Sequence, residues 1–370
     1  MHGLRLIHLD RNENRYGPAP ACLRVLAEAT PDLLFNYSRS FERGSSSDLA
    51  AHLARMHGVA EDRLILGYGC EDILKEAVHH FLPAGRAVAI PSASWWYYHA
   101  VAGEVGGVTV EYPIRAGATC YEYDVDALIR LRETASPALV LVASPNNPTG
   151  NSLGHEPLLR VLDAYRDVPV ILDQAYHGFT PSGSDGIGEL TRQYPRLLVL
   201  RTFSKLFALA GVRIGYAVCG DDLEAFRAYS ARYLGFNRLS EELALAALAS
   251  PAYYREVAVG MEESRQRLYR LFRSLPGCAA FESDANFVLV RLAPAMATLL
   301  ARELPARGLV VKFLKEPGFE HHARISLGTA QEIDQLVRAV EALAAADAAI
   351  VPPAATSATS RQTRALGETM

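Results

Sequence analysis

Short apolar runs alternate with segments of helical period between residues 64 and 219, and this alternation limits the fold more than any other feature. Residues 138–143 are apolar without a break, as expected of a strand buried on both faces. Between residues 73 and 82, apolar side chains recur at helical spacing. The alternation predicts an α/β fold with a mostly parallel central sheet and helices on both faces. We expect further strands at 64–66, 86–90, 108–112, 169–172, 197–200 and 214–219, and further helices at 20–29, 47–56, 124–133 and 156–166.

The pattern changes after about residue 235 and predicts a second, smaller α+β domain. We expect helices at 239–248, 257–275, 299–307 and 331–345, and strands at 281–292, 309–313 and 323–327. Residues 9–14 are polar and are expected to form an ordered arm, not a strand or a helix. The chain should therefore divide into an N-terminal arm at 1–30 that packs with the small domain, a large domain at 31–235, a small domain at 236–350 and a disordered tail at 351–370.

A lysine follows one of the expected buried strands in a context that suits cofactor chemistry. Lys205 comes after the run 197–200, directly behind Ser204 and eight residues before Arg213. A lysine amine held in a partly desolvated pocket can form a Schiff base with an aldehyde cofactor. Ser204 and the guanidinium of Arg213 could then hold the cofactor's phosphate. The alternative is an ordinary surface lysine beside a structural ion pair.

A glycine turn provides a second candidate for phosphate binding. Gly69, Cys70 and Glu71 lie between the strand at 64–66 and the next helix. A helix that starts at such a turn presents free backbone N–H groups and the positive end of its dipole. Many strand-to-helix turns carry glycine, so this signal is weak without the rest of the site.

Other expected strand ends carry side chains that complement a pyridine ring. Asn147 follows the strand at 138–143, and Asp173 and Tyr176 follow the strand at 169–172. An acid at such a position is costly unless it has a positive partner. Trp95 lies beyond the strand at 86–90 in a cluster of rings that could cover a heteroaromatic cofactor or fill a core. Together these groups match the needs of pyridoxal 5′-phosphate: an amide and a phenol for the ring oxygen, a carboxylate for the ring nitrogen and a lysine for the aldehyde.

Six motifs resemble those of one enzyme family. In the order of the chain they occupy residues 9–14, 144–150, 173–176, 201–205, 209–213 and 323–328. On these motifs the chain resembles the fold-type-I pyridoxal-phosphate aminotransferases of class I/II, and within them the histidinol-phosphate aminotransferase branch. The resemblance covers nearly the whole chain and implies the fold of that family.

The resemblance implies a role for each matching residue around the cofactor. Lys205 would be the Schiff-base lysine, Asp173 the partner of the pyridine nitrogen, and Asn147 and Tyr176 the partners of the ring oxygen. Trp95 would stack on the ring. The residues implied in phosphate binding are Gly69, Cys70, Glu71, Ser204 and Arg213.

The resemblance also implies a substrate side and a partner. Arg324 would clamp the substrate α-carboxylate with help from Asn147, and Asn14 and Tyr16 would lie on the same side. Tyr37 stands where the family uses a tyrosine that reaches the cofactor phosphate of the neighbouring subunit. The expected assembly is therefore a homodimer with shared active sites.

Three residues depart from the motifs of the family. Gln174 replaces a glutamate after Asp173, Trp95 replaces the usual stacking tyrosine, and Arg15 replaces a proline. Gln174 and Trp95 are expected to surround the cofactor. Arg15 and the ring cluster around Trp95 are expected to alter the substrate pocket.

The implied reaction moves an amino group between an amino acid or amine phosphate and a 2-oxo acid. A decarboxylase of a phosphorylated amino acid would use the same lysine, and an aminotransferase of a specialised pathway would differ only in its substrate. A regulator that binds the cofactor without catalysis is a third alternative, although Lys205 and Asp173 are both present and no DNA-binding segment is added.

The composition excludes several other classes of protein. The net charge is −4 without a basic stripe, which argues against a nucleic-acid-binding protein. No apolar run reaches 18 residues, and the first ten residues do not resemble a signal peptide. The five cysteines are scattered and the eleven histidines lack metal-ligand spacing, so we expect reduced thiols, no metal and a cytoplasmic location.

Overall fold

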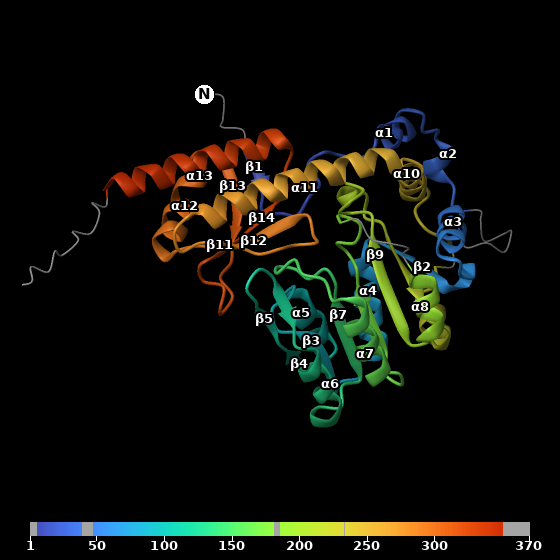
Figure 1. Ribbon diagram of the computed structural model, residues 1–370. Coiled ribbons are helices and arrows are strands. Elements are labelled where there is room, and N and C mark those ends of the chain that lie inside the picture. The colour runs from blue at the N-terminus through green and yellow to red at the C-terminus, as the bar shows by residue number, and fades with distance from the viewer. Residues whose placement is uncertain (1–5, 39–46, 181–185, 233, 351–370) are drawn as a thin grey trace, which may run out of the picture.

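The computed structural model describes residues 6–38, 47–180, 186–232 and 234–350 (Figure 1). The tail expected at 351–370 lies outside the described residues. Two sheets dominate the described part, and one long helix runs beside both of them (Figure 1). The domain boundaries expected at residues 30, 235 and 350 stay predictions.

The larger sheet contains seven of the described strands in the order β2-β10-β9-β8-β7-β3-β4. All neighbours in it are parallel except β10, which runs antiparallel to both β9 and β2, so the prediction of a mostly parallel sheet is confirmed. The strands are β2 (Leu64–Gly67), β3 (Ala87–Pro91), β4 (Val108–Tyr112), β7 (Leu139–Ala143), β8 (Val170–Asp173), β9 (Leu197–Thr202) and β10 (Gly215–Cys219).

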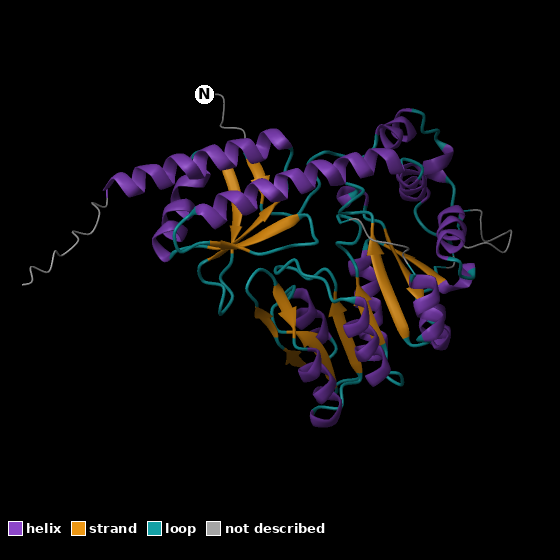
Figure 2. Cartoon of the chain, in the orientation of Figure 1, coloured by secondary structure: helices purple, strands orange, loops and turns teal. Residues whose placement is uncertain are grey.

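Helices cover both faces of this sheet, as predicted (Figure 2). Side chains of β7 alternate between two cores, with Val140 and Val142 in one and Leu139 and Leu141 in the other. The first core is shared with α1 (Pro20–Ala27), α3 (Asp48–His57), α6 (Val125–Thr134), α7 (His155–Ala164), α8 (Ile187–Gln193) and α10 (Arg238–Leu248). The second is shared with α4 (Cys70–Phe81), α5 (Tyr97–Glu104) and α9 (Glu224–Tyr229). The short helix α2 (Asp32–Phe35) follows α1.

The smaller sheet has the order β1-β13-β14-β12-β11. Its strands are β1 (Ile7–Leu9), β11 (Ala279–Ala280), β12 (Phe287–Arg291), β13 (Leu309–Phe313) and β14 (His322–Ser326), and its core includes side chains of α11 (Pro251–Ser274), α12 (Pro294–Ala306) and α13 (Ala330–Ile350). In α11, Tyr254 belongs to the core of the large sheet, whereas Val257, Met261 and Leu268 belong to the core of the small sheet. The long helix is thus embedded in both.

Some elements differ from the expectation. The arm begins with a strand, β1, which pairs in parallel with β13 about three hundred residues later in the chain. The strand expected from residue 281 begins only at Phe287. The helices α5 and α8 and the hairpin of β5 (Ile114–Ala116) and β6 (Tyr121–Tyr123) were not predicted. Strands of two or three residues are too short for an apolar period to reveal them.

Within the described part of the chain, no helix combines the length and apolar character needed to span a bilayer.

A buried histidine connects the β5–β6 hairpin to the small sheet and should make stability depend on pH. His322 lies among aromatic rings, with Tyr121 Oη 3.4 Å from its Nε2 and the Phe281 ring stacked against it. Burial, and then the positive charge of Arg291, lower the pKa of His322 to about 4. Because only the unfolded state takes up this proton between about pH 6.5 and pH 4, the free energy of unfolding should fall by up to about 3 kcal/mol as the pH drops through that window.

Urea unfolding at a series of pH values checks this prediction. In His322→Gln the histidine contribution to the pH dependence should vanish, whereas the exposed neighbour in His321→Gln should leave it unchanged. An identical difference between His322→Gln and the unmodified protein at pH 7 and pH 4.5 would contradict the assignment.

Candidate active site

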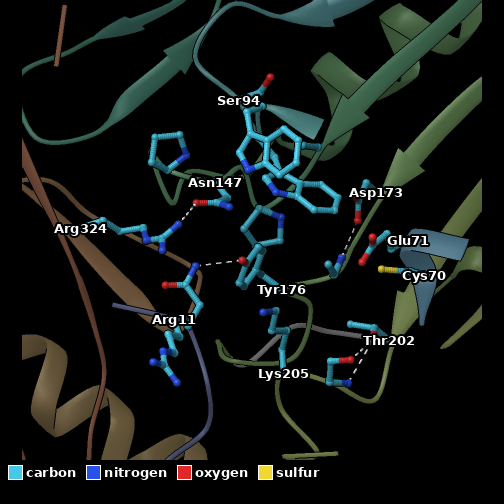
Figure 3. A pocket seen from close by; sticks show the side chains of 18 of the residues that line it. Arg11, Cys70, Glu71, Ser94, Asn147, Asp173, Tyr176, Thr202, Lys205 and Arg324 are labelled. Carbon is cyan, nitrogen blue, oxygen red and sulfur yellow. Dashed lines mark hydrogen bonds between the residues drawn. The ribbon is translucent and has the colours of Figure 1, made fainter. Parts of the chain in front are cut away.

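A cavity of about 440 Å³ opens where the carboxyl ends of β7, β8 and β9 face the small sheet. Open α/β sheets bind ligands at this edge. The large sheet and its following loops contribute Asn147, Asp173, Tyr176 and Lys205, and β14 contributes Arg324 from the opposite side (Figure 3). The structure therefore brings the predicted strand-end residues into one cavity.

Asp173 is a buried carboxylate with a fixed orientation. It is 7% exposed at the end of β8. The Tyr98 hydroxyl donates to Oδ2 at 2.8 Å, and the backbone N–H of Ala175 donates to Oδ1 at 3.0 Å. Burial raises the pKa of Asp173, while these two hydrogen bonds and the charge of Lys205 oppose that rise. A buried acid of this kind suits a cationic ring nitrogen as its partner.

Lys205 lies in the turn after β9 with its amine over the ring of Tyr176, 5.4 Å from the ring centroid (Figure 3). The hydroxyl of Tyr176 in turn accepts a hydrogen bond from Asn12 Nδ2 at 2.9 Å. Asn12 belongs to the N-terminal arm, so the arm fixes the tyrosine that faces the lysine. The amine is thereby placed at the wall of the cavity, where an aldehyde carbon could meet it.

The glycine turn and Arg213 lie against each other at the start of α4. Gly69 has φ +82°, and a Cβ atom on it would come within 2.7 Å of Arg213 Nη2. The guanidinium of Arg213 is 3.5 Å from Ser204 Oγ and 3.3 Å from Glu71 Oε2. Because the first N–H groups of a helix have no partner within it, α4 adds backbone donors at this point. The donor set fits a phosphate group.

Close packing of β10 holds this turn in place. A Cβ atom on Gly215 would lie 2.4 Å from the backbone nitrogen of Cys70. Only a glycine lets the strand approach the turn so closely. The predicted phosphate-binding residues therefore gather where β10 meets the start of α4.

Arg324 is a largely buried cation that lacks an anion. Its Nη1 donates to Asn147 Oδ1 at 2.6 Å, and its Nη2 donates to the backbone oxygen of Asp10 at 2.7 Å. Its Nε is buried without a hydrogen-bond partner among the described residues. Burial lowers the pKa of Arg324, because removing a guanidinium from water is unfavourable. A substrate carboxylate would supply the missing charge and acceptor.

Comparison with known proteins identifies the family. The model of the family "aminotransferase class I and II" matches residues 5–340. The chain belongs to this aminotransferase family.

The relatives and solved structures agree with this assignment. The chain is 32% identical to "histidinol-phosphate aminotransferase 2" of Thiobacillus denitrificans, covering 91% of each chain. It is 31% identical to the protein of the same name from Archaeoglobus fulgidus, covering 90% of this chain and 92% of the relative. The crystal structure of histidinol-phosphate aminotransferase from Sinorhizobium meliloti, in complex with pyridoxal-5′-phosphate, has a TM-score of 0.81 and 26% identity, and the match covers 91% of this chain and 90% of that one. The predictions of a fold-type-I aminotransferase similar to the histidinol-phosphate branch, and of pyridoxal phosphate as cofactor, are confirmed.

Some expected site residues of this aminotransferase do not line its cavity. Asn14 is buried and donates to the backbone oxygen of Leu206 at 2.7 Å. Tyr16 lies against α11, where its hydroxyl would be 2.6 Å from a Cβ atom on Gly260. Tyr37 is 64% exposed and lies outside the cavity of its own chain. The substrate role of Asn14 and Tyr16 and the reach of Tyr37 into a neighbouring subunit stay predictions.

Two of the three departures act away from the cavity. Arg15 forms an ion pair with Glu332 on α13 at 2.8 Å and does not line the cavity, so the expectation that it alters the substrate pocket was wrong. Gln174 accepts hydrogen bonds from Arg201 Nε and Nη2 at 3.0 and 2.8 Å. It therefore supports the chain behind Asp173 instead of surrounding the cofactor. Trp95 does line the cavity, as expected.

Sequence reasoning also missed several residues of the aminotransferase cavity. The lining includes Arg11, Asn12, Thr202 and Lys312, to which no role was assigned. Asn12 lies inside the motif at 9–14, and this position was the available signal. Lys312 carries no local signal, because its place in the cavity depends on the pairing of β13 with β14.

Proposed function

We propose that this protein moves an amino group between histidinol phosphate, or a closely similar amine phosphate, and a 2-oxo acid. The observation that carries the proposal is that the amine of Lys205 and the carboxylate of Asp173 line the same cavity, with Arg324 across from them. The names of the relatives with 31–32% identity over nine tenths of the chain support the choice of substrate.

The residues of the chain divide the work of the reaction. Bound pyridoxal phosphate supplies an electron sink that stabilises negative charge at the substrate α-carbon. Asp173 holds the proton at the ring nitrogen, and Arg213, Ser204 and the start of α4 hold the phosphate. Lys205 binds the aldehyde carbon and, once displaced, its Nζ takes the proton from the substrate α-carbon.

Cations around the cavity support an anionic substrate. Arg11 and Lys312 line it in addition to Arg324, and both are exposed to solvent. Glu316 is the acid that lines the same region. A substrate phosphate could contact Lys312 or Arg11, while the 2-oxo acid uses Arg324 in the second half of the reaction.

A substrate panel tests the proposal. The protein loaded with pyridoxal phosphate should lose its visible absorbance band when histidinol phosphate is added and regain it with one 2-oxo acid. Carbon dioxide release without any need for a 2-oxo acid would instead identify a decarboxylase. Transfer from other amines but not from histidinol phosphate would identify an aminotransferase of another pathway.

Replacing Arg324 with lysine tests the carboxylate site. Lysine lacks the planar fork and cannot contact Asn147, the Asp10 oxygen and a carboxylate together. We expect KM for the 2-oxo acid to rise about 10-fold to 100-fold, the worth of a hydrogen bond to a charged group, with a smaller effect on kcat. Steady-state kinetics check this, with Arg291→Lys as the control because Arg291 is exposed and does not line the cavity. An unchanged KM would remove Arg324 from the proposed site.

The proposal includes a homodimer in the cytoplasm. Large apolar side chains of α1 and α2 are exposed, among them Leu23 at 56%, Leu34 at 76% and Phe35 at 70%, and they lie near Tyr37 in sequence. A second subunit would cover such a surface. The five cysteines are free, which supports a reducing compartment. Sedimentation of the purified protein checks the dimer.

A further inference from the structure

The hydrogen bond from Tyr98 to Asp173 has no counterpart in the roles described so far. We propose that Tyr98 is a positioning residue, which keeps Asp173 ionised and aimed at the ring nitrogen of the cofactor. The inference rests on the proposed function, because it concerns the same cavity. It assigns a role to one ring of the aromatic cluster that sequence reasoning treated as a possible cover for the cofactor or as core.

Packing leaves the Tyr98 hydroxyl one direction in which to bond. The residue is the second of α5 and only 2% exposed. Its ring belongs to the core between α4, α5 and the large sheet, and the edge of the Trp95 ring meets it at 5.9 Å. A buried phenol needs a partner for its hydroxyl, and here the partner is the carboxylate at the end of β8.

Two donors from different elements clamp the carboxylate. Tyr98 holds Oδ2 from α5, and the backbone N–H of Ala175 holds Oδ1 from the loop after β8. A carboxylate has about four lone-pair sites, so two remain for a ligand in the cavity. With both oxygens held, the carboxylate cannot rotate away from that ligand.

The surrounding groups make Tyr98 a lasting donor. Burial raises the pKa of Tyr98 well above its ordinary value, and the charge of Asp173 adds to this, so the phenol keeps its proton at neutral pH. Burial also raises the pKa of the neighbouring Cys70 thiol. Lys205 is the cation that acts on Asp173. Without the phenol, burial would favour the neutral acid, which could not hold a proton on the ring nitrogen.

Tyr98→Phe removes the hydroxyl and keeps the ring. We expect turnover to fall about 10-fold to 100-fold, as for the loss of one hydrogen bond to a charged group. The matched control is Tyr165→Phe, because the Tyr165 hydroxyl is also buried and donates to the backbone oxygen of Leu128 at 2.7 Å, in the other core of the large sheet. The control should lose a similar amount of thermal stability and keep its turnover.

Nitrogen NMR of protein loaded with ¹⁵N-labelled pyridoxal phosphate separates positioning from a general loss of structure. The ring-nitrogen signal should report a protonated nitrogen in the unmodified protein at pH 8 and in Tyr165→Phe, and shift toward the unprotonated value in Tyr98→Phe. An unprotonated ring nitrogen in the unmodified protein, which needs no variant to observe, would overturn the proposal. So would a signal in Tyr98→Phe identical to that of the unmodified protein.

A cofactor analogue with carbon in place of the ring nitrogen gives the second readout. If Tyr98 acts through Asp173 and that nitrogen, Tyr98→Phe and the unmodified protein should turn over equally with the analogue. A deficit that persists with the analogue would show a role in packing instead. Failure of the unmodified protein to bind pyridoxal phosphate or to transfer an amino group would contradict the proposed function itself, and is distinguishable from both results.

Discussion

Replacing Lys205 with alanine is expected to abolish amino-group transfer, with turnover at least about 10⁴-fold below that of the unmodified protein. The variant loses both the covalent attachment point for the aldehyde and the base that moves the α-proton. The lysine amine lies over Tyr176 at the wall of the cavity, and no other amine on the large-sheet side lines it. Single-turnover kinetics with histidinol phosphate and a 2-oxo acid measure the loss.

Lys75→Ala is the matched control for this variant. Lys75 is an exposed lysine on α4 that pairs with Glu104, so its loss should leave turnover within about twofold. Appreciable residual transfer by Lys205→Ala, together with an unchanged visible spectrum of the bound cofactor, would contradict the assignment of Lys205.

Replacing Asp173 with asparagine is expected to lower turnover about 30-fold to several thousand-fold, the range found when one partner of a buried charge pair is removed. Asparagine keeps the size of the side chain and can still accept hydrogen bonds from Tyr98 and Ala175. It cannot carry the negative charge that holds a proton at the ring nitrogen. The variant therefore tests the charge and not the shape.

Asp167→Asn controls for the loss of an acid. Asp167 pairs with Arg132 on the surface, where such pairs contribute little, and its replacement should leave turnover unchanged. Steady-state kinetics and the ¹⁵N signal of the ring nitrogen are measured on both variants. Turnover by Asp173→Asn within about threefold of the unmodified protein would show that this carboxylate is not the partner of the ring.

Most of the cavity was predictable because its residues follow apolar runs. A buried strand is visible in sequence, and parallel strands bring their carboxyl ends to one edge. Asn147, Asp173 and Lys205 each stand just beyond such a run, so their proximity follows from the sheet. Arg324 lies in a different sheet, and its approach to Asn147 was implied only by the resemblance to the family.

Contacts between side chains of separate elements were not predictable. Tyr98 was one of four adjacent aromatic residues, and only the start of α5 decides which of them turns toward Asp173. Arg15 appeared to face the substrate, but its partner is a glutamate 317 positions later in the chain. Such pairs depend on how the elements pack, and no local period reports that.

The helix α11 contributes side chains to both cores. Sliding the small sheet away from the large one would strip water-free contacts from Tyr254 at one end of the rod or from Met261 and Leu268 farther along it. The two halves of the molecule should therefore melt as one cooperative unit, so that the walls of the cavity exist together or not at all.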